Sequence, residues 1–463
     1  MSTAGHLHHP PLLASQAPPV PWSQKLPEMA LRFQAIVLLG YAVAGKGFAY
    51  LGVPPLYVGE CLLLAMAGSC LLVRGLFSRL TNLPAILLLM LCGWCAVQTL
   101  QHVDEYGMES LRDAAVWTYA GIAIAVAALC GARPQRLVEL IIRYRHFPTI
   151  FVLAMPAVFF LGRFTRPGLP LVPGTNVPII SMKEADVLVH LAGILAFWTA
   201  GLGSKASGWA MLLLAGCAAV MGVIDRAGMV AFGAVFALCL LARPAGAPTT
   251  RCIIAIVIAL AALWATDVSI EVPGGKGRVI SFDQVVTNVQ SIASDTGSDG
   301  LDSTKEWRID WWTGIVDYTF RGEYFWTGKG FGVNLADDDG FQVQADRSLR
   351  SPHSAHMTFL ARGGVPALVL WLASQAAWVV CIARAYFVSR ARRQRRWESL
   401  FFFLFCYWLA FFINASFDVY LEGPVGGIWF WSLFGVGLAA LDLHRRAPQT
   451  LDALDTLDAG VPA

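Results

Sequence analysis

Twelve apolar windows dominate this sequence, and most are long enough to cross the roughly 30 Å of hydrocarbon in a membrane. Only 14% of residues are charged, against about 25% in a typical soluble domain. Because a helix satisfies its own backbone hydrogen bonds in lipid, we predict an all-α polytopic membrane protein with about twelve transmembrane helices. The windows lie near 31–53, 56–73, 83–101, 114–131, 147–162, 184–202, 207–223, 226–242, 252–266, 355–386, 399–416 and 425–443.

Charged residues between the windows alternate in sign, which predicts the orientation of the chain. Cytoplasmic loops of membrane proteins are enriched in Lys and Arg, and a cytoplasmic N-terminus puts the basic loops on that side. Both termini are then cytoplasmic. The inside loops hold Arg74, Arg79, Arg133, Arg136, Arg143, Arg145, Lys205, Arg243, Arg251, Arg390, Arg392, Arg393, Arg395, Arg396, Arg445 and Arg446; the short outside loops hold Asp104, Glu105, Glu109, Asp418 and Glu422.

The windows divide the chain into five parts. Residues 1–30 are expected to form a disordered cytoplasmic tail, residues 31–266 hold spans 1–9, residues 353–443 hold spans 10–12, and residues 444–463 form a second cytoplasmic tail. Between spans 9 and 10 lies one large, partly helical external loop, residues 267–352, with fourteen acidic and eight basic side chains. A second external segment, 162–183, carries four prolines, which forbid a continuous helix; its role stays open.

The large loop contains a predicted helix with an arginine in an unusual place. Ser303-Thr-Lys-Glu306 is a capping-box pattern, and it predicts a helix running to about Phe320. The aromatic residues of this helix share a broad apolar arc, which favours an interfacial helix at headgroup level. Arg308 falls inside that arc. It either snorkels from the apolar face or points into a membrane-facing cavity to meet an anion, and we favour the second interpretation.

Two further groups of charges lie close to the external ends of spans. Arg226 follows Asp225 at the mouth of a span, where a charge is costly and functional by default; the alternatives are an interfacial anchor or an ion pair between the two. Lys46 and Glu60 reach similar depth across a tight turn, which predicts a structural ion pair, and both are candidates to support the site.

Several histidines remain as candidates for chemistry. His353 lies where the external loop enters span 10, and histidine is the side chain best suited to proton transfer near neutral pH. His356 lies one turn deeper, where we expect it to pack or support the site. No Cys or Glu at ligand spacing completes a zinc site with this pair, so no metal is expected. Asp186 and His190 share one face of span 6 and form a polar patch of unknown role.

The acidic run Asp337-Asp338-Asp339 is interpreted as a solvated turn, with loose cation binding as the less favoured alternative. The net charge of +3 is too small and too dispersed to indicate a nucleic-acid partner.

These features together resemble the O-antigen ligase family of bacterial envelope glycosyltransferases. The resemblance rests on twelve spans with the large loop before span 10, on the stretch Arg308 to Trp312, and on Gly328-Lys-Gly-Phe-Gly332. It rests also on His353-Ser-Ala-His-Met followed by Gly364-Val-Pro-Ala367, with Met357 in place of Leu and Ala367 in place of Gly. Asp225-Arg226-Ala-Gly228 resembles the family's Ser-Arg-Gly, with Asp in place of Ser.

The resemblance implies transfer of a glycan from undecaprenyl diphosphate to an acceptor sugar hydroxyl, on lipid A-core or another glycan, at the periplasmic face of the bacterial inner membrane. Arg226 and Arg308 would bind the donor diphosphate and His353 would act as general base, with no cofactor. A polymerase that extends carrier-linked repeats is the alternative within the family. A polysaccharide transporter or flippase is a further alternative, although transporters usually place their charges near the midplane.

Overall fold

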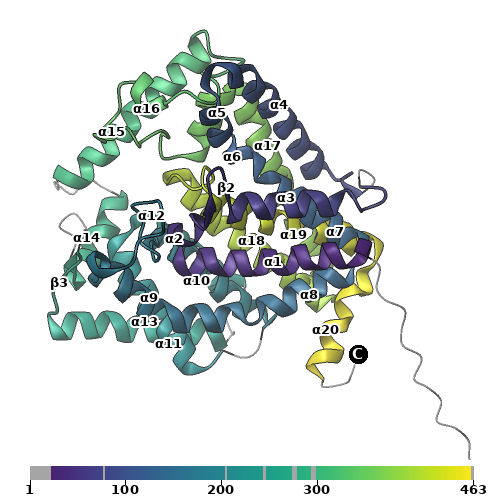
Figure 1. Cartoon of the computed structure of the whole chain (residues 1–463). Helices are drawn as coiled ribbons and strands as arrows, with labels where there is room; N and C mark the ends of the chain where they lie inside the picture. Colours follow the sequence, from purple (N-terminus) through teal and green to yellow (C-terminus); the bar gives the residue numbers. More distant parts are fainter. Residues whose placement is uncertain are drawn as a thin grey trace, which may run out of the picture.

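The computed structural model describes residues 22–459 except 77–78, 204–205, 243–246, 274–278 and 294–298. The described residues form an all-α bundle in which every predicted window contains a helix (Figure 1). These helices are α1 (Trp22–Ala44), α3 (Val58–Cys70), α4 (Leu83–Tyr106), α7 (Ala120–Ala132), α9 (Phe147–Phe164), α10 (Glu184–Ala200), α11 (Gly208–Ile224), α12 (Arg226–Ala242), α13 (Ala247–Thr266), α17 (Ala355–Ala391), α18 (Arg395–Phe417) and α19 (Pro424–Arg446).

Shorter elements join these helices. Those between spans are α2 (Lys46–Ala49), β1 (Gly52–Val53), β2 (Leu56–Tyr57), α5 (Met108–Asp113), α6 (Ala115–Thr118), α8 (Gln135–Tyr144) and the 3₁₀ turn η2 (Arg166–Gly168). Those of the large loop are β3 (Ile270–Glu271), β4 (Val279–Ile280), α14 (Phe282–Ala293), α15 (Asp299–Val316), the π-helical turn η3 (Asp317–Arg321) and α16 (Leu335–Asp338). The C-terminal pair is η4 (Pro448–Asp452) and α20 (Ala453–Asp458). Strands β1 and β2, and separately β3 and β4, form small antiparallel ribbons.

Within the described residues, seven helical stretches are long and apolar enough to cross a membrane, and four shorter helices are apolar. The all-α membrane fold is therefore confirmed, whereas the number of twelve spans stays a prediction. The long window at 355–386 does not form one continuous helix. Gly364, with φ 72°, breaks α17 into a short first part and a long second part.

Small residues let the central helices approach one another closely, as is common where helices pack in membranes. A Cβ at Gly435 of α19 would meet the backbone of Ala123 in α7, and a Cβ at Gly193 of α10 would meet the ring of Tyr407 in α18. Helices α7, α10, α18 and α19 consequently hold much of the buried core.

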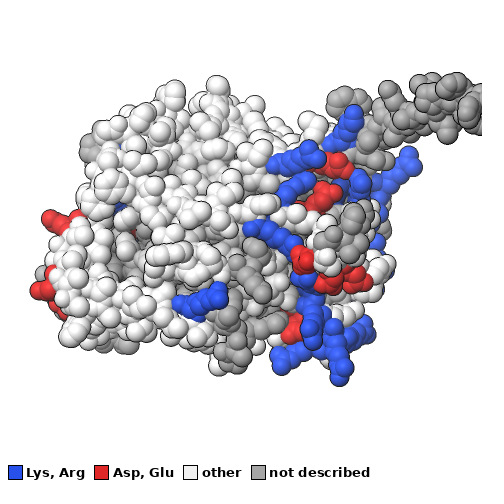
Figure 2. Space-filling view, turned by 90° about the horizontal axis from the view of Figure 1, so that it is seen from below, with Lys and Arg blue, Asp and Glu red and all other residues white. Residues whose placement is uncertain are grey.

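Basic side chains, Lys and Arg together, gather at one end of the molecule (Figure 2). Arg145, which precedes α9, and Arg396, at the start of α18, both pair with Asp458 of α20, at 2.7 Å and 2.6 Å. Arg133, after α7, pairs with Glu28 of α1. Segments that the arginine pattern assigns to the same side of the membrane therefore meet at one end. Which compartment that end faces stays a prediction.

Both terminal segments differ from their predicted form. Helix α1 begins at Trp22, nine residues before the expected start of the first span, so residues 22–30 are helical; residues 1–21 of the predicted disordered tail lie outside the described residues. At the other end the tail folds back on the bundle, because Leu451 and Leu454 are fully buried in the main core.

The glycine strip, Gly328 to Gly332, docks the large loop onto the kink of α17. Its three glycines all have positive φ, where glycine carries no steric cost. The backbone amide of Lys329 donates to Ala361 at 2.7 Å, and that of Val365 donates to Phe325 at 2.8 Å. A Cβ at Gly328 would collide with the same part of α17. The strip thus fixes the loop immediately beside the helix that follows His353.

Candidate functional site

Three segments that are distant in sequence converge on Asp418, which directly follows α18. His353 places its Nδ1 3.5 Å from Asp418 Oδ1, and Lys183 places its Nζ 2.7 Å from Asp418 Oδ2. Arg308 of α15 donates to the carbonyl of Phe417, the preceding residue, at 2.9 Å. A carboxylate thus stands between an imidazole and an ammonium, with a guanidinium one residue away.

His353 is held in a strained backbone conformation by its neighbours. Its φ of 56° lies in the left-handed region, which non-glycine residues adopt mainly in turns and at functional sites. Ser351 and Thr358, on either side of it, both donate to Glu422 Oε1, at 2.8 Å and 2.6 Å. Trp312 of α15 donates to the carbonyl of Pro352 at 2.7 Å. These contacts fix the segment, so the imidazole has a defined place.

The distance between His353 Nδ1 and the Asp418 carboxylate is long for a hydrogen bond. Hydrogen bonds of catalytic groups are often long without substrate and tighten in the complex. The arrangement makes Nδ1 the nitrogen that faces Asp418 and leaves Nε2 for another partner. An imidazole supported in this way is suited to accept a proton.

Arg308 has donor capacity that the described protein does not use. Its Nε is buried and has no hydrogen-bond partner among the described residues. Burial lowers the pKa of Arg308, while Asp418 and Asp225 act in the opposite direction. An arginine remains charged under these conditions. A partly buried guanidinium with an unused N–H is a natural place for an anion.

Other charges surround this group. Burial lowers the pKa of Lys183, but Asp418 and Asp186 outweigh it, and the net effect is a raised pKa. Lys46 lies within electrostatic reach of Lys183 and Asp418 as well. The ammonium groups therefore stay close to two carboxylates, and the site mixes both signs of charge.

Arg226 reaches this region through the start of α12. Asp225 Oδ1 accepts from the backbone amide of Gly228 at 2.8 Å, which is an N-terminal cap of the helix. Asp and Ser are both good capping residues, so the departure from the family's Ser-Arg-Gly is conservative. Gly228 lets α12 approach α10, since a Cβ there would collide with Ala185 and Leu188. Asp225 acts electrostatically on Arg308, so the start of α12 lies within reach of the charged site; that Arg226 and Arg308 bind one diphosphate stays a prediction.

A cavity of about 160 Å³ adjoins the site. It lies between α9, the segment 162–183, α10 and α11, and its lining includes Arg163, Arg166, Lys183 and Glu184. Lys183 also contacts Asp418, so this residue belongs both to the cavity lining and to the group of charges around Asp418. The proline-bearing segment 162–183, whose role the sequence left open, is one wall of this cavity.

His356 has both ring nitrogens engaged. Trp371 Nε1 donates to its Nδ1 at 2.9 Å, and its Nε2 lies 2.8 Å from Ser416 Oγ. An indole N–H is a donor only, so Nδ1 must be the acceptor and Nε2 carries the hydrogen. His356 is thereby fixed as a neutral packing residue that links α17 to α18.

The ion pair expected between Lys46 and Glu60 is wrong. Glu60 Oε2 accepts from the backbone amide of Tyr57 at 3.2 Å, and Oε1 accepts from the Tyr119 hydroxyl at 2.7 Å. Glu60 therefore caps α3 and bonds to α7's N-terminal end. Lys46 lies with the charges around Asp418 instead.

Asp186 and His190 do not form a common patch. His190 is buried among aromatic rings, with its Nδ1 2.7 Å from the Tyr407 hydroxyl. Asp186, one turn earlier, acts electrostatically on Lys183 at the start of α10. The first is a core residue, and the second belongs to the charged site.

The apolar arc of the loop helix is partly covered by protein, since Trp311 and Ile315 pack with Leu335 and with Leu360 of α17 in a separate core. The position of this helix at headgroup level stays a prediction. The interpretation of the acidic run as a solvated turn is wrong for Asp339, although Asp338 is half exposed. Asp339 accepts from Trp311 Nε1 at 2.6 Å and pairs with Lys329 at 2.5 Å, and its side chain is only 5% exposed.

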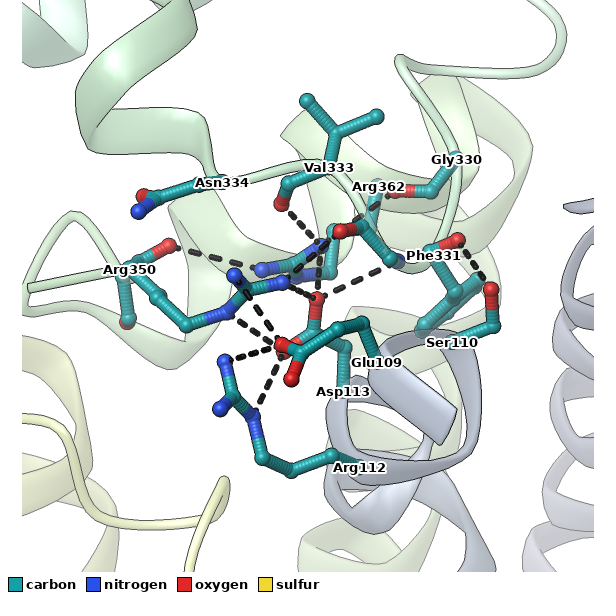
Figure 3. Close-up of polar contacts among 12 residues, drawn as sticks. Glu109, Ser110, Arg112, Asp113, Gly330, Phe331, Val333, Asn334, Arg350 and Arg362 are labelled. Atoms are coloured by element: carbon teal, nitrogen blue, oxygen red, sulfur yellow. Dashed lines mark hydrogen bonds and ion pairs between the residues drawn. The ribbon is translucent and has the colours of Figure 1, made fainter. Parts of the chain in front are cut away.

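Asp113 of α5 anchors the other side of the loop (Figure 3). Its Oδ2 lies 2.8 Å from Arg350 Nη2 and 2.9 Å from Arg362 Nη1, and it accepts from the Gly332 amide at 3.1 Å. Arg362 also donates to the carbonyls of Gly330 and Val333. We call this group the Asp113 clamp. It ties α5 to α17 and to the segment that leads into His353.

Sequence reasoning missed Lys183 as a site residue and used Asp418 only as a topology marker. The available signal was position, because each is a charge directly beside an apolar window. Their pairing across 235 residues has no local signature.

Replacing Asp418 by asparagine is expected to destabilise the fold. Burial raises the pKa of Asp418, but Lys183 and His353 outweigh it and hold the pKa below its usual range. A carboxyl with a lowered pKa stabilises the fold above its ordinary pKa of about 4, and this contribution is lost as the pH falls further. The substitution leaves Lys183 without its carboxylate partner, and the effect is moderated because the Lys183 side chain is 37% exposed. We therefore expect the free energy of unfolding to fall by about 1–3 kcal/mol near neutral pH.

Thermal unfolding in detergent at a series of pH values measures this. The variant should melt lower than the parent near neutral pH, and the difference should shrink as the pH falls to about 3. Asp317→Asn is the control, because its carboxylate is exposed and pairs within its own helical turn. A difference that stays constant with pH would contradict the assignment.

The fold and this site together define a membrane-embedded protein with a charged, histidine-bearing site at one end of its helices. Residues 209–372 match the family model described as O-antigen ligase. This segment contains Arg226, Arg308 and His353, and the match supports the predicted family over this part of the chain; members of that family are membrane enzymes of glycosyltransferase type. The chain has no significant match among curated proteins.

Proposed function

We propose that this protein is a glycosyltransferase that moves a glycan from undecaprenyl diphosphate to an acceptor sugar hydroxyl at the periplasmic face of the bacterial inner membrane. The observation that carries the proposal is the position of His353. Its imidazole faces Asp418 and stands beside Arg308, which has an unused buried donor. Base and anion-binding group are thereby brought together from different segments.

His353 acts as the general base in the proposed reaction. The acceptor hydroxyl attacks the anomeric carbon of the donor sugar, and its proton passes to Nε2 of His353. Asp418 faces the other nitrogen and stabilises the imidazolium that forms, as a carboxylate does in other histidine-based sites. Attack from the side opposite the leaving group inverts the configuration at the anomeric carbon.

The arginines act on the leaving group. As the bond between the anomeric carbon and the phosphate oxygen breaks, its electron pair stays with the diphosphate, and negative charge grows there. Preorganised cations stabilise such charge strongly where water is excluded. Arg308 supplies its unused Nε and Arg226 approaches from the start of α12, while the polyprenyl tail of the donor lies in the surrounding lipid.

Transfer by the purified protein tests this function. The full chain in lipid nanodiscs is incubated with an undecaprenyl-diphosphate-linked glycan and either lipid A-core or a second carrier-linked glycan. The proposal requires donor consumption with release of undecaprenyl diphosphate. Failure with both acceptors, despite intact protein, would contradict it.

A polymerase is the second candidate, and the cavity beside Lys183 favours it, because a second carrier-linked chain needs a place next to the site. Gene deletion distinguishes the possibilities in cells. Loss of a ligase leaves long glycan that is not joined to lipid A-core, and loss of a polymerase leaves single repeats. Absence of external glycan would instead indicate a transporter.

The orientation predicts that residues 267–352 are periplasmic and both termini cytoplasmic. Val343 is 64% exposed, so a Val343→Cys variant in a cysteine-free background should react with a membrane-impermeant maleimide in intact spheroplasts. A cysteine introduced at Thr456, in the exposed face of α20, should react only after lysis. The reverse pattern would overturn the topology.

A further inference from the structure

A larger cavity, of about 300 Å³, lies far from His353 between α1, α8, α9, α18 and α19. Most of its walls are apolar and come from all five helices; they include Leu38, Leu39, Phe147, Phe403, Leu433 and Val436. We call it the inner groove. Its volume is in the range of ligand pockets in proteins.

The inner groove has a cationic edge. Arg143 and His146 are part of its lining, and they lie where α8 ends and α9 begins. The neighbouring Arg145 pairs with Asp458 of the C-terminal helix, so this edge belongs to the arginine-rich end of the molecule in Figure 2. The apolar walls continue from it toward the middle of the bundle.

The guanidinium of Arg143 has capacity for a further partner. Its Nη2 contacts Glu139 at 3.1 Å, and an arginine presents five N–H donors in all. His146 beside it is exposed. A phosphate at this edge would therefore meet two groups that donate hydrogen bonds, one of which is always charged.

The wall of the inner groove also contains a buried polar side chain, Gln34, with an acceptor atom that is unpaired within the part of the chain that the structure describes. Gln34 is 3% exposed and donates through Nε2 to Ser432 Oγ at 2.7 Å, and both residues line the groove. The Gln34 Oε1 atom is buried and has no hydrogen-bond partner among the described residues. A water or a headgroup hydroxyl can donate to this acceptor, whereas an acyl chain cannot.

We propose that the inner groove binds one acidic phospholipid from the bilayer leaflet on the arginine-rich side. An acyl chain lies along the apolar walls, and the phosphate rests on Arg143 and His146. Basic pockets between transmembrane helices bind anionic headgroups in this manner. The donor of the proposed reaction is a different molecule, because its diphosphate belongs at the opposite end, where Arg308 and His353 lie. The inference is thus independent of the proposed function.

Native mass spectrometry of the full chain tests the proposal, with the detergent-purified protein titrated with phosphatidylglycerol or phosphatidylcholine. We expect one saturable phosphatidylglycerol adduct that is several times stronger than the phosphatidylcholine adduct. Arg143→Ala should weaken it about fivefold, as for one arginine near an anionic headgroup. Ala35→Trp, which fills the groove from α1, should remove it.

Arg133→Ala is the matched control, because Arg133 lies at the same end but pairs with Glu28 and is not part of the groove lining. It should keep the adduct. Equal binding of both lipids, loss of the adduct in the control to the same extent as in Arg143→Ala, or retention of the adduct in both groove variants would overturn the proposal. Finding undecaprenyl phosphates in the groove in place of phospholipid would overturn it as well.

Discussion

Replacing His353 by alanine is expected to lower the rate of glycan transfer by about 10²–10⁴-fold, the usual share of general-base catalysis. The protein should still insert and fold, because the segment around His353 is held by Ser351, Thr358 and Trp312 rather than by the imidazole. Transfer from a purified undecaprenyl-diphosphate-linked donor, at matched protein concentration, measures the effect. The loss should fall on kcat.

His356→Ala is the control for the loss of a histidine that has a packing role. The His356 ring is used on both sides for packing between α17 and α18, so its loss should reduce stability while leaving appreciable turnover per folded molecule. Normal activity of His353→Ala combined with an inactive His356→Ala would reverse the assignment. If both variants were fully active, the histidine mechanism would be wrong.

Arg308→Lys is expected to reduce transfer by about 10²–10³-fold, the usual cost of removing one group that stabilises charge in the transition state. Lysine keeps the positive charge, but an ammonium cannot reproduce the planar fork that binds a phosphate at two oxygens. It also cannot place a donor at the position of the buried Nε. Measurements at varied donor concentration should therefore show a lower kcat as well as a higher KM.

Arg321→Lys is the matched control in the same loop. Its side chain is 81% exposed and pairs with Asp317 one turn earlier, so the exchange should leave transfer within about twofold of the parent, as for surface ion pairs of little energetic value. A fully active Arg308→Lys enzyme would remove Arg308 from the anion-binding role.

The apolar windows were enough to predict the all-α membrane fold. Each apolar window holds a helix, because hydrophobic length and the need for internal backbone hydrogen bonds leave few other solutions in lipid. What length could not predict was the boundary of α1, since residues 22–30 continue a helix outside the apolar window.

The site was predictable only in part. His353 and Arg308 stood out because each is a polar residue where the local pattern is apolar or changes. Their meeting at Asp418 depends on packing between segments more than 40 residues apart, and no local rule carries that information. The expected Lys46–Glu60 pair is wrong for a related reason. Similar depth in the membrane does not determine which groups pair, and Glu60 instead accepts from Tyr119 and from the backbone of Tyr57.

The left-handed backbone at His353 has a practical consequence for trapping the enzyme with its donor. Asparagine and aspartate, with histidine, are the non-glycine residues that adopt this conformation most readily, whereas alanine and β-branched residues do so at a cost. His353→Asn should thus preserve the local chain path while removing the base. Such a variant is the natural choice for capturing an unreacted carrier-linked glycan beside Arg308, where a turnover-competent enzyme would consume it.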